Sequence, residues 1–208
     1  MLSLGSSMVD DRPTRDNTGR MMRTLRATAL AATTLSLAVL PGVALAGNPK
    51  GAVQDAKQLR VLVNDSPSAQ LFSDAARLVQ QMSSSREALL QQKAKLDAVL
   101  RTADPALSTA LRKLGAWTPA SAFGKGMRGY ALWIVGIEAQ AVSGAEQALR
   151  GYEKLTPAAQ ERSLQAVVTA FTGKLRAIIK GNNAKLGAAR VGIPDDEIKA
   201  ISALSASG

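Results

Sequence analysis

The sequence predicts an all-α protein, and three observations support that prediction. Apolar residues recur at steps of three and four over long stretches, which is the spacing of one face of a helix. Aromatic residues make up only 3% of the chain, and no stretch alternates cleanly between polar and apolar residues as a strand does. Proline and glycine divide the chain into segments of helical length. We therefore expect an up-and-down helical bundle of about four to five helices with a short helical C-terminal tail.

The spacing of apolar residues predicts the first helices. Segment 51–63 has apolar residues at helical spacing, and residues 64–67 should break the chain after it. The most regular pattern runs from about residue 68 to residue 101 and predicts one helix. Its heptad seam, with two polar interruptions, consists of Leu71, Ala75, Leu78, Met82, Ser85, Leu89, Gln92, Leu96 and Val99. We expect this seam to face the inside of a bundle rather than to form an intermolecular coiled coil.

Capping residues followed by proline predict three later helix starts, at Asp104–Pro105, Thr118–Pro119 and Thr156–Pro157. The last of these helices should run to about Lys180, because Gly181–Asn183 has the composition of a left-handed stop. Acidic residues at 195–197 should open a final helix. The predicted organisation is thus a leader over 1–46, a bundle over 47–183 and a tail over 184–208.

The leader has the pattern of a cleaved export signal. A short basic start at 21–26 precedes an uncharged run over 27–40, and Ala44-Leu45-Ala46 supplies the small-x-small motif of a signal peptidase site. The apolar run is shorter than the roughly 20 residues of a membrane span, so an uncleaved anchor is the less favoured alternative. Three aspartates upstream suggest that translation starts at Met21 or Met22. We expect a periplasmic or secreted protein that begins after Ala46.

Composition restricts the chemistry. The whole chain has 26 basic and 16 acidic residues, and the leader contains five of the basic and three of the acidic ones. The mature chain therefore keeps 21 basic and 13 acidic residues, which gives a net charge of +8. Outside the cytoplasm, such a charge favours binding to anionic lipids, envelope polymers or acidic proteins. We expect no nucleic acid partner. Cysteine and histidine are both absent, which removes disulfides, Ser-His-Asp and Cys-His catalysis and ordinary zinc sites. We expect no cofactor and no metal.

Three further features of the central region bear on function. Residues 124–129 match the letters of a dinucleotide-binding loop, but they lack the preceding strand, so a basic link or kinked helix is favoured. Segment 130–137 is apolar all round, which is typical of a central buried helix or of contact with lipid. Glu138 would be a plausible general acid if it were buried, but helical-wheel arithmetic places it at the edge of the polar face. A solvated or paired glutamate is therefore expected there.

A basic stripe is the best binding candidate. Arg162, Arg176 and Lys180 share one helix face opposite the apolar face, and no acidic residue occurs between Arg162 and Arg190. The leading hypothesis is a non-catalytic, exported helical protein that binds an anionic or protein partner as an adaptor, chaperone-like protein or inhibitor. One alternative is a membrane-active or membrane-associated protein that uses segment 130–137. A weaker one is a glycan-cleaving enzyme with Glu138 as its acid.

Overall fold

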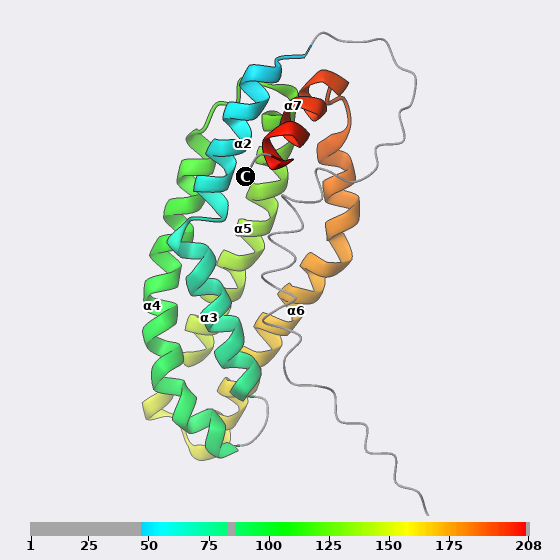
Figure 1. The fold of residues 1–208 in the computed structure, drawn as a ribbon. Helices are drawn as coiled ribbons and strands as arrows, with labels where there is room; N and C mark the ends of the chain where they lie inside the picture. The colour runs from blue at the N-terminus through cyan, green and yellow to red at the C-terminus, as the bar shows by residue number, and fades with distance from the viewer. Residues whose placement is uncertain (1–46, 83–85, 207–208) are drawn as a thin grey trace, which may run out of the picture.

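The protein is all-helical over the residues that its computed structural model describes, 47–82 and 86–206, and these residues contain no strand (Figure 1). The elements are α2 (Pro49–Val63), α3 (Pro67–Met82), α4 (Arg86–Ala116), α5 (Ala122–Leu149), the short 3-10 helix η2 (Tyr152–Lys154), α6 (Pro157–Arg190) and α7 (Asp195–Ala206). The predicted leader, 1–46, lies outside the described residues.

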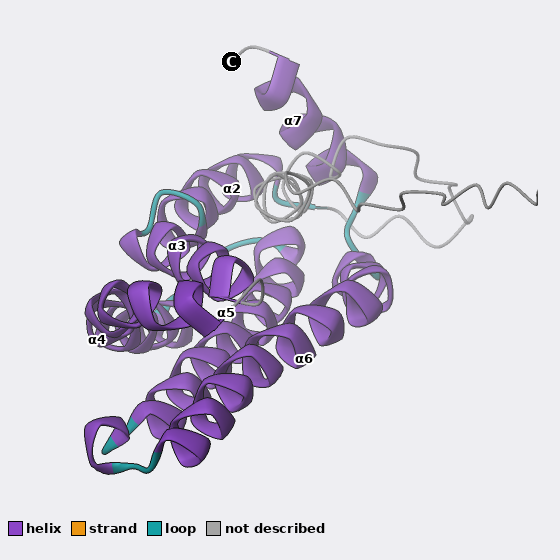
Figure 2. Cartoon of the chain, turned by 90° about the horizontal axis from the view of Figure 1, so that it is seen from below, coloured by secondary structure: helices purple, strands orange, loops and turns teal. Residues whose placement is uncertain are grey.

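Helix α5 is the central element. It contacts each of the other α-helices, and its most extensive contacts are with α6 and α4. Figure 2, which looks along the molecule, shows α4 on one side of α5 and α6 on the other. Helices α2 and α3 follow one another along the long axis, and α7 packs against α2 at one end (Figure 1). A helix surrounded in this way has to be apolar on most of its circumference, which is the pattern that segment 130–137 shows.

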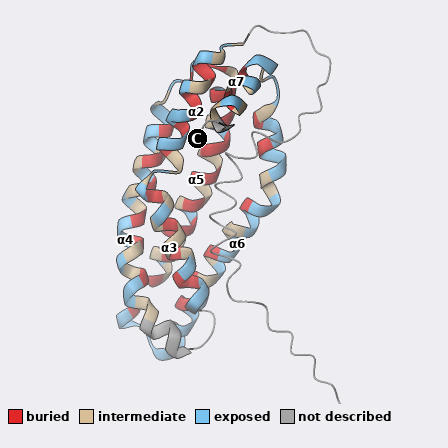
Figure 3. Cartoon of the chain, viewed as in Figure 1, coloured by how far each residue is buried: buried red, intermediate tan, exposed pale blue. Residues whose placement is uncertain are grey.

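The core runs through the middle of the molecule, and Figure 3 shows the buried residues on the helix faces that point inward. Phe72 of α3 and Phe171 of α6 stack there, with ring centroids 5.6 Å apart, and both are fully buried. Leu96, Leu107 and Leu114 bury the inward face of α4. The apolar steps that predicted these helices therefore form one shared core.

Three predicted elements are confirmed. Segment 51–63 corresponds to α2, which ends before the predicted break. Thr156 is the N-cap of α6 with Pro157 in its first turn, and the acidic residues at 195–197 open α7. These three features depend on short-range periodicity, on a proline in the first turn and on acids in the first turn, which the sequence displays directly.

The single helix predicted over 68–101 is wrong. Helices α3 and α4 pack against each other and run in opposite directions, so the seam belongs to two helices (Figure 1). Folding back lets the apolar faces of the two halves bury each other, with Phe72 and Val79 on one side and Leu100 on the other. The side chains of the seam between residues 82 and 91, among them Ser85 and Leu89, lie outside the described part.

Two predicted helix boundaries are also wrong. Pro105 lies inside α4, although a proline there removes a backbone donor. The helix continues because Ala103 and Leu107, on either side of the proline, are fully buried in the core. The helix start predicted at the second proline pair, Thr118–Pro119, is displaced by a few residues: α5 begins at Ala122, and its N-cap is Ser121.

The predicted stop at Gly181–Asn183 does not end α6, which continues to Arg190. A Cβ on Gly181 would lie 2.7 Å from Cζ2 of Trp133, so the glycine permits α6 to lie close to α5. The Tyr130 hydroxyl donates to Oδ1 of Asn182, which further joins the two helices. The chain turns only at Gly192, whose φ of 78° is left-handed. The predicted boundary at 183/184 thus falls inside α6.

Candidate functional site

The basic stripe lies on the outer face of α6. This helix buries Leu164, Val167 and Phe171 against the rest of the molecule, while Arg162, Arg176 and Lys180 are exposed. Arg162 and Lys180 are 18 residues apart, which is five full turns, so they project in the same direction. Arg176 is one turn from Lys180. The three groups therefore occupy one face over about 27 Å of helix length.

The charges of the stripe are not neutralised within the described part of the chain. No described acidic group lies within ion-pair distance of Arg162, Arg176 or Lys180, and the Nε atom of Arg162 donates only to the carbonyl of Ala158 in the same helix. Lys174, on another face of α6, donates instead to Oε1 of Gln140 on α5 at 2.6 Å. The stripe thus keeps its positive charge available to an external group.

An exposed apolar side chain lies beside the basic stripe. Ile179 is 47% exposed and lies three residues after Arg176, beside Lys180. Residues three and four apart are neighbours on a helix surface, so Arg176 has Ile179 on one side and Lys180 on the other. Ile179 can therefore add apolar contact area beside the charge of Arg176.

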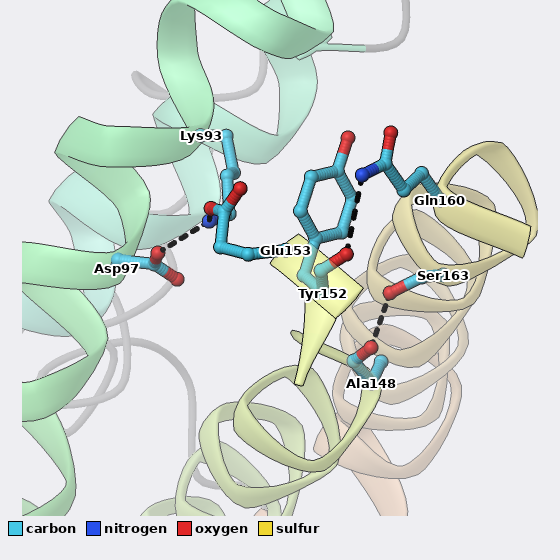
Figure 4. A network of polar contacts seen from close by, with 7 residues as sticks. All are labelled: Lys93, Asp97, Ala148, Tyr152, Glu153, Gln160 and Ser163. Carbon is cyan, nitrogen blue, oxygen red and sulfur yellow. Dashed lines mark hydrogen bonds and ion pairs between the residues drawn. The ribbon is translucent and has the colours of Figure 1, made fainter. Parts of the chain in front are cut away.

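A second polar feature is a hollow of about 540 Å³ between α4 and η2, beside the contacts shown in Figure 4. Lys93 of α4 is central to it: its ammonium group lies 3.1 Å from Asp97, contacts Glu153 of η2 and lies 4.6 Å from the ring centroid of Tyr152. Burial lowers the pKa of Lys93, but hydrogen bonds to Glu153 and Asp97 and their negative charges outweigh it and raise the pKa overall. Lys93 is therefore held as a cation, which is unsuited to a nucleophilic amine.

The residues around this hollow connect α4 to the turn between α5 and α6. Gln160 of α6 donates to the carbonyl of Tyr152 at 3.2 Å, and Ser163 donates to the carbonyl of Ala148. Lys93 forms ion pairs with the carboxylates of Asp97 and Glu153. Together with the hydrogen bonds of Gln160 and Ser163, these ion pairs hold η2 in place (Figure 4). We interpret the cluster as a structural clamp.

The structure corrects one part of the expectation for Glu138, namely that its side chain is solvated at the edge of the polar face. The residue is only 1% exposed, so it is neither solvated nor at an open edge. A helical wheel does not show this burial, because it does not show which neighbouring helices contact α5. In the preceding segment, Tyr130, Ile134 and Val135 are buried and pack in the core.

The glycine-rich segment 124–129 forms the first turns of α5, so the structural context of a dinucleotide loop is absent from it. Two of its glycines serve close packing. A Cβ on Gly124 would lie 2.3 Å from Oδ2 of Asp55, and one on Gly126 would lie 2.0 Å from the carbonyl oxygen of Ala189 on α6. Gly129 has open space beside it. The segment is therefore a contact point between helices.

Two buried carboxylates, one from α2 and one from α7, contact the start of α5, and the sequence did not predict either contact. Asp55 of α2 accepts hydrogen bonds from Ser121, and Glu197 of α7 accepts the backbone N–H of Phe123 at 2.9 Å. Both side chains are nearly inaccessible, at 4% for Asp55 and 1% for Glu197. The only available signal was an acid at an apolar position of a helical pattern. Together they satisfy N–H groups that a helix start leaves without partners.

Within the described residues, no group of carboxylates has the arrangement of a metal site, and no helix has the length and apolarity needed to cross a membrane. No protein-family model, curated protein or solved structure matches this chain.

Proposed function

We propose that this chain is an exported, non-catalytic up-and-down helical bundle that binds an anionic partner of the cell envelope through Arg162, Arg176 and Lys180. The observation that supports it most is the exposure of these three cations on one face of α6, with no described acidic partner. The partner is a negatively charged surface, either a lipid membrane or an acidic protein.

The geometry favours a surface over a small ligand. The cations are spread over about 27 Å along one helix and do not line the hollow beside Lys93. A flat or extended partner can meet all of them at once, and Ile179 would add a limited apolar contact beside Arg176. The leader pattern that ends at Ala46 supports a partner outside the cytoplasm.

Charge reversal tests the proposal. The variant Arg162→Glu, Arg176→Glu, Lys180→Glu should keep its helical circular dichroism, because the three side chains lie away from the core. It should lose binding to vesicles that contain phosphatidylglycerol and, in a parallel arm, to soluble polyglutamate. The first arm isolates a lipid surface, and the second represents an acidic protein.

A matched control has the same net charge. Lys57, Arg112 and Lys113 are exposed on α2 and α4 and lie in none of the described ion pairs, so their reversal to Glu changes the total charge equally. The control should bind clearly better than the stripe variant. Equal binding by the stripe variant and wild type at low salt would mean that the stripe is only a solvated face.

A further inference from the structure

The structure points to a role for the amino group that cleavage after Ala46 would create. Gly47 would become the first residue, and it lies against the first turn of α7. A Cβ on Gly47 would lie 2.2 Å from Oδ1 of Asp196 and 2.9 Å from Cγ of Glu197. We infer that the new α-ammonium group of Gly47 binds to the Asp196 carboxylate and joins the mature N-terminus to α7. This inference rests on the cleavage site in the proposed function.

The residue after Gly47 is firmly held. The backbone N–H of Asn48 donates to Oε1 of Glu197 at 2.8 Å, and its side chain accepts from Gly51 N–H at 3.0 Å and donates to the carbonyl of Ala120 at 3.3 Å. Asn48 is thus bonded to α2, to α7 and to the segment before α5. Only one residue separates this anchor from the predicted cleavage site, so the new terminus cannot move far from α7.

Cleavage changes the charge at this position. Hydrolysis of the Ala46–Gly47 peptide bond by a signal peptidase adds one water: the carbonyl carbon of Ala46 becomes a carboxylate, and the nitrogen of Gly47 becomes an ammonium group. A neutral amide is thereby replaced by a cation. An opposite charge at short range favours the charged form of an amine, so we expect the pKa of this group to exceed its ordinary value of about 7.7–8.0.

The titratable groups on the elements that meet here are few. Helix α7 brings Asp195, Asp196 and Glu197, whereas α2 brings Lys50 and Asp55 and α5 brings Lys125. Asp55 is occupied by its hydrogen bonds from Ala120 and Ser121. Glu197 is buried and already accepts N–H groups from Asn48, Ala122 and Phe123. Asp196 is exposed, and its described hydrogen bond comes from the N–H of Glu197 at 2.9 Å. Asp196 is therefore the carboxylate with capacity for the new ammonium group.

The test uses the full chain expressed in an exporting host, where intact mass identifies the first residue. The α-amino group is then labelled by reductive methylation with ¹³C, and its pKa is measured by NMR. Asp196→Asn is compared with the matched control Asp195→Asn, which removes the same charge one residue away. Asparagine can still accept the Glu197 N–H, so the fold should persist.

We expect a mature protein that begins at Gly47, with an α-amino pKa raised in the wild type. Asp196→Asn should lower that pKa by at least about half a unit, and Asp195→Asn should lower it less. A retained leader, an ordinary α-amino pKa, or equal effects of the two variants would each overturn the inference. Vesicle binding by the α6 stripe is measured separately, so failure here is distinguishable from failure of the proposed function.

Discussion

The carboxylate of Asp55 accepts the hydroxyl of Ser121 at 2.6 Å, and the same oxygen accepts the Ser121 backbone N–H at 2.9 Å. Ser121 in turn accepts the N–H of Gly124 at 3.0 Å and is the N-cap of α5. An acid on α2 thus orients the cap of the central helix, although 66 residues separate the two. This contact couples α2 to α5, the helix around which the other described helices pack.

Replacing Asp55 with alanine should therefore destabilise the protein strongly. The change leaves the buried Ser121 N–H and the Ala120 N–H without their acceptor, at a cost of about 2–4 kcal/mol in the free energy of unfolding. Urea unfolding monitored by circular dichroism measures this loss. Asp65→Ala, at an exposed site, is the control and should stay within about 0.5 kcal/mol of wild type. Similar losses in the two variants would contradict the coupling.

The stacked aromatic pair in the core provides a second stability prediction. Phe171 is fully buried against Phe72, so Phe171→Ala should lower the free energy of unfolding by about 2–5 kcal/mol. The neighbouring Thr172 is exposed, and Thr172→Ala serves as the comparison. Chemical denaturation of both variants checks the difference. A loss below about 0.5 kcal/mol for Phe171→Ala would place this residue at the surface.

Two glycines of α5 should respond in opposite directions to alanine. Gly126→Ala places a Cβ 2.0 Å from the Ala189 carbonyl, a backbone atom that cannot move without shifting α6. We expect it to destabilise by about 1–3 kcal/mol. Gly129→Ala meets open space and should stabilise by up to about 1 kcal/mol, because alanine is the better helix former. Thermal unfolding of the pair is the measurement, and equal midpoints would refute the close approach of α5 and α6.

The acidity of Glu146 gives a pH-dependent prediction. Burial raises its pKa, as does the nearby charge of Asp104, while Arg150 and Arg101 partly offset the effect. A carboxyl with a raised folded pKa favours the folded state at low pH, and that contribution is lost as pH rises from the unfolded pKa through the folded one. Glu146→Gln should thus raise the unfolding midpoint relative to wild type at pH 7 but not at pH 3.

The control for that comparison is Glu161→Gln, which removes a carboxylate from an exposed position of α6. It should not reproduce the gain at pH 7. A stabilisation by Glu146→Gln that is equal at both pH values would show that ionisation of Glu146 is not its cause.

Local signals predicted several elements correctly, and tertiary contacts account for the errors. The starts of α6 and α7 depend on Pro157 and on acids in the first turn, which act within one turn of helix. The continuity of α6 through Gly181 depends instead on Trp133, which is distant in sequence. Likewise, the periodicity of residues 68–101 is the same for one long helix and for two helices folded together. Only burial distinguishes them.

In the candidate sites, too, local signals were predictive and tertiary contacts were not. The exposure of Arg162 and Lys180 could be predicted, because the residues on the opposite face of α6 are apolar. The burial of Glu138 and the hydrogen bonds of Glu197 could not, because a helical wheel identifies a face but not the helices that cover it. Polar residues in a buried face are the positions where periodicity fails as a guide.

Salt dependence is the sharpest prediction for the α6 stripe. Because Arg162, Arg176 and Lys180 are exposed, their attraction to an anionic surface should be screened as the Debye length shortens from about 14 Å near 50 mM salt to about 8 Å near 150 mM. Wild-type binding to phosphatidylglycerol vesicles should weaken several-fold over that range in a sedimentation assay. The charge-neutral variant with all three residues changed to Gln should bind weakly throughout and respond little to salt. Ile179→Ser should weaken binding without altering the salt response, since it removes apolar contact and no charge. A wild-type affinity that does not change with salt would refute an electrostatic contact by this face.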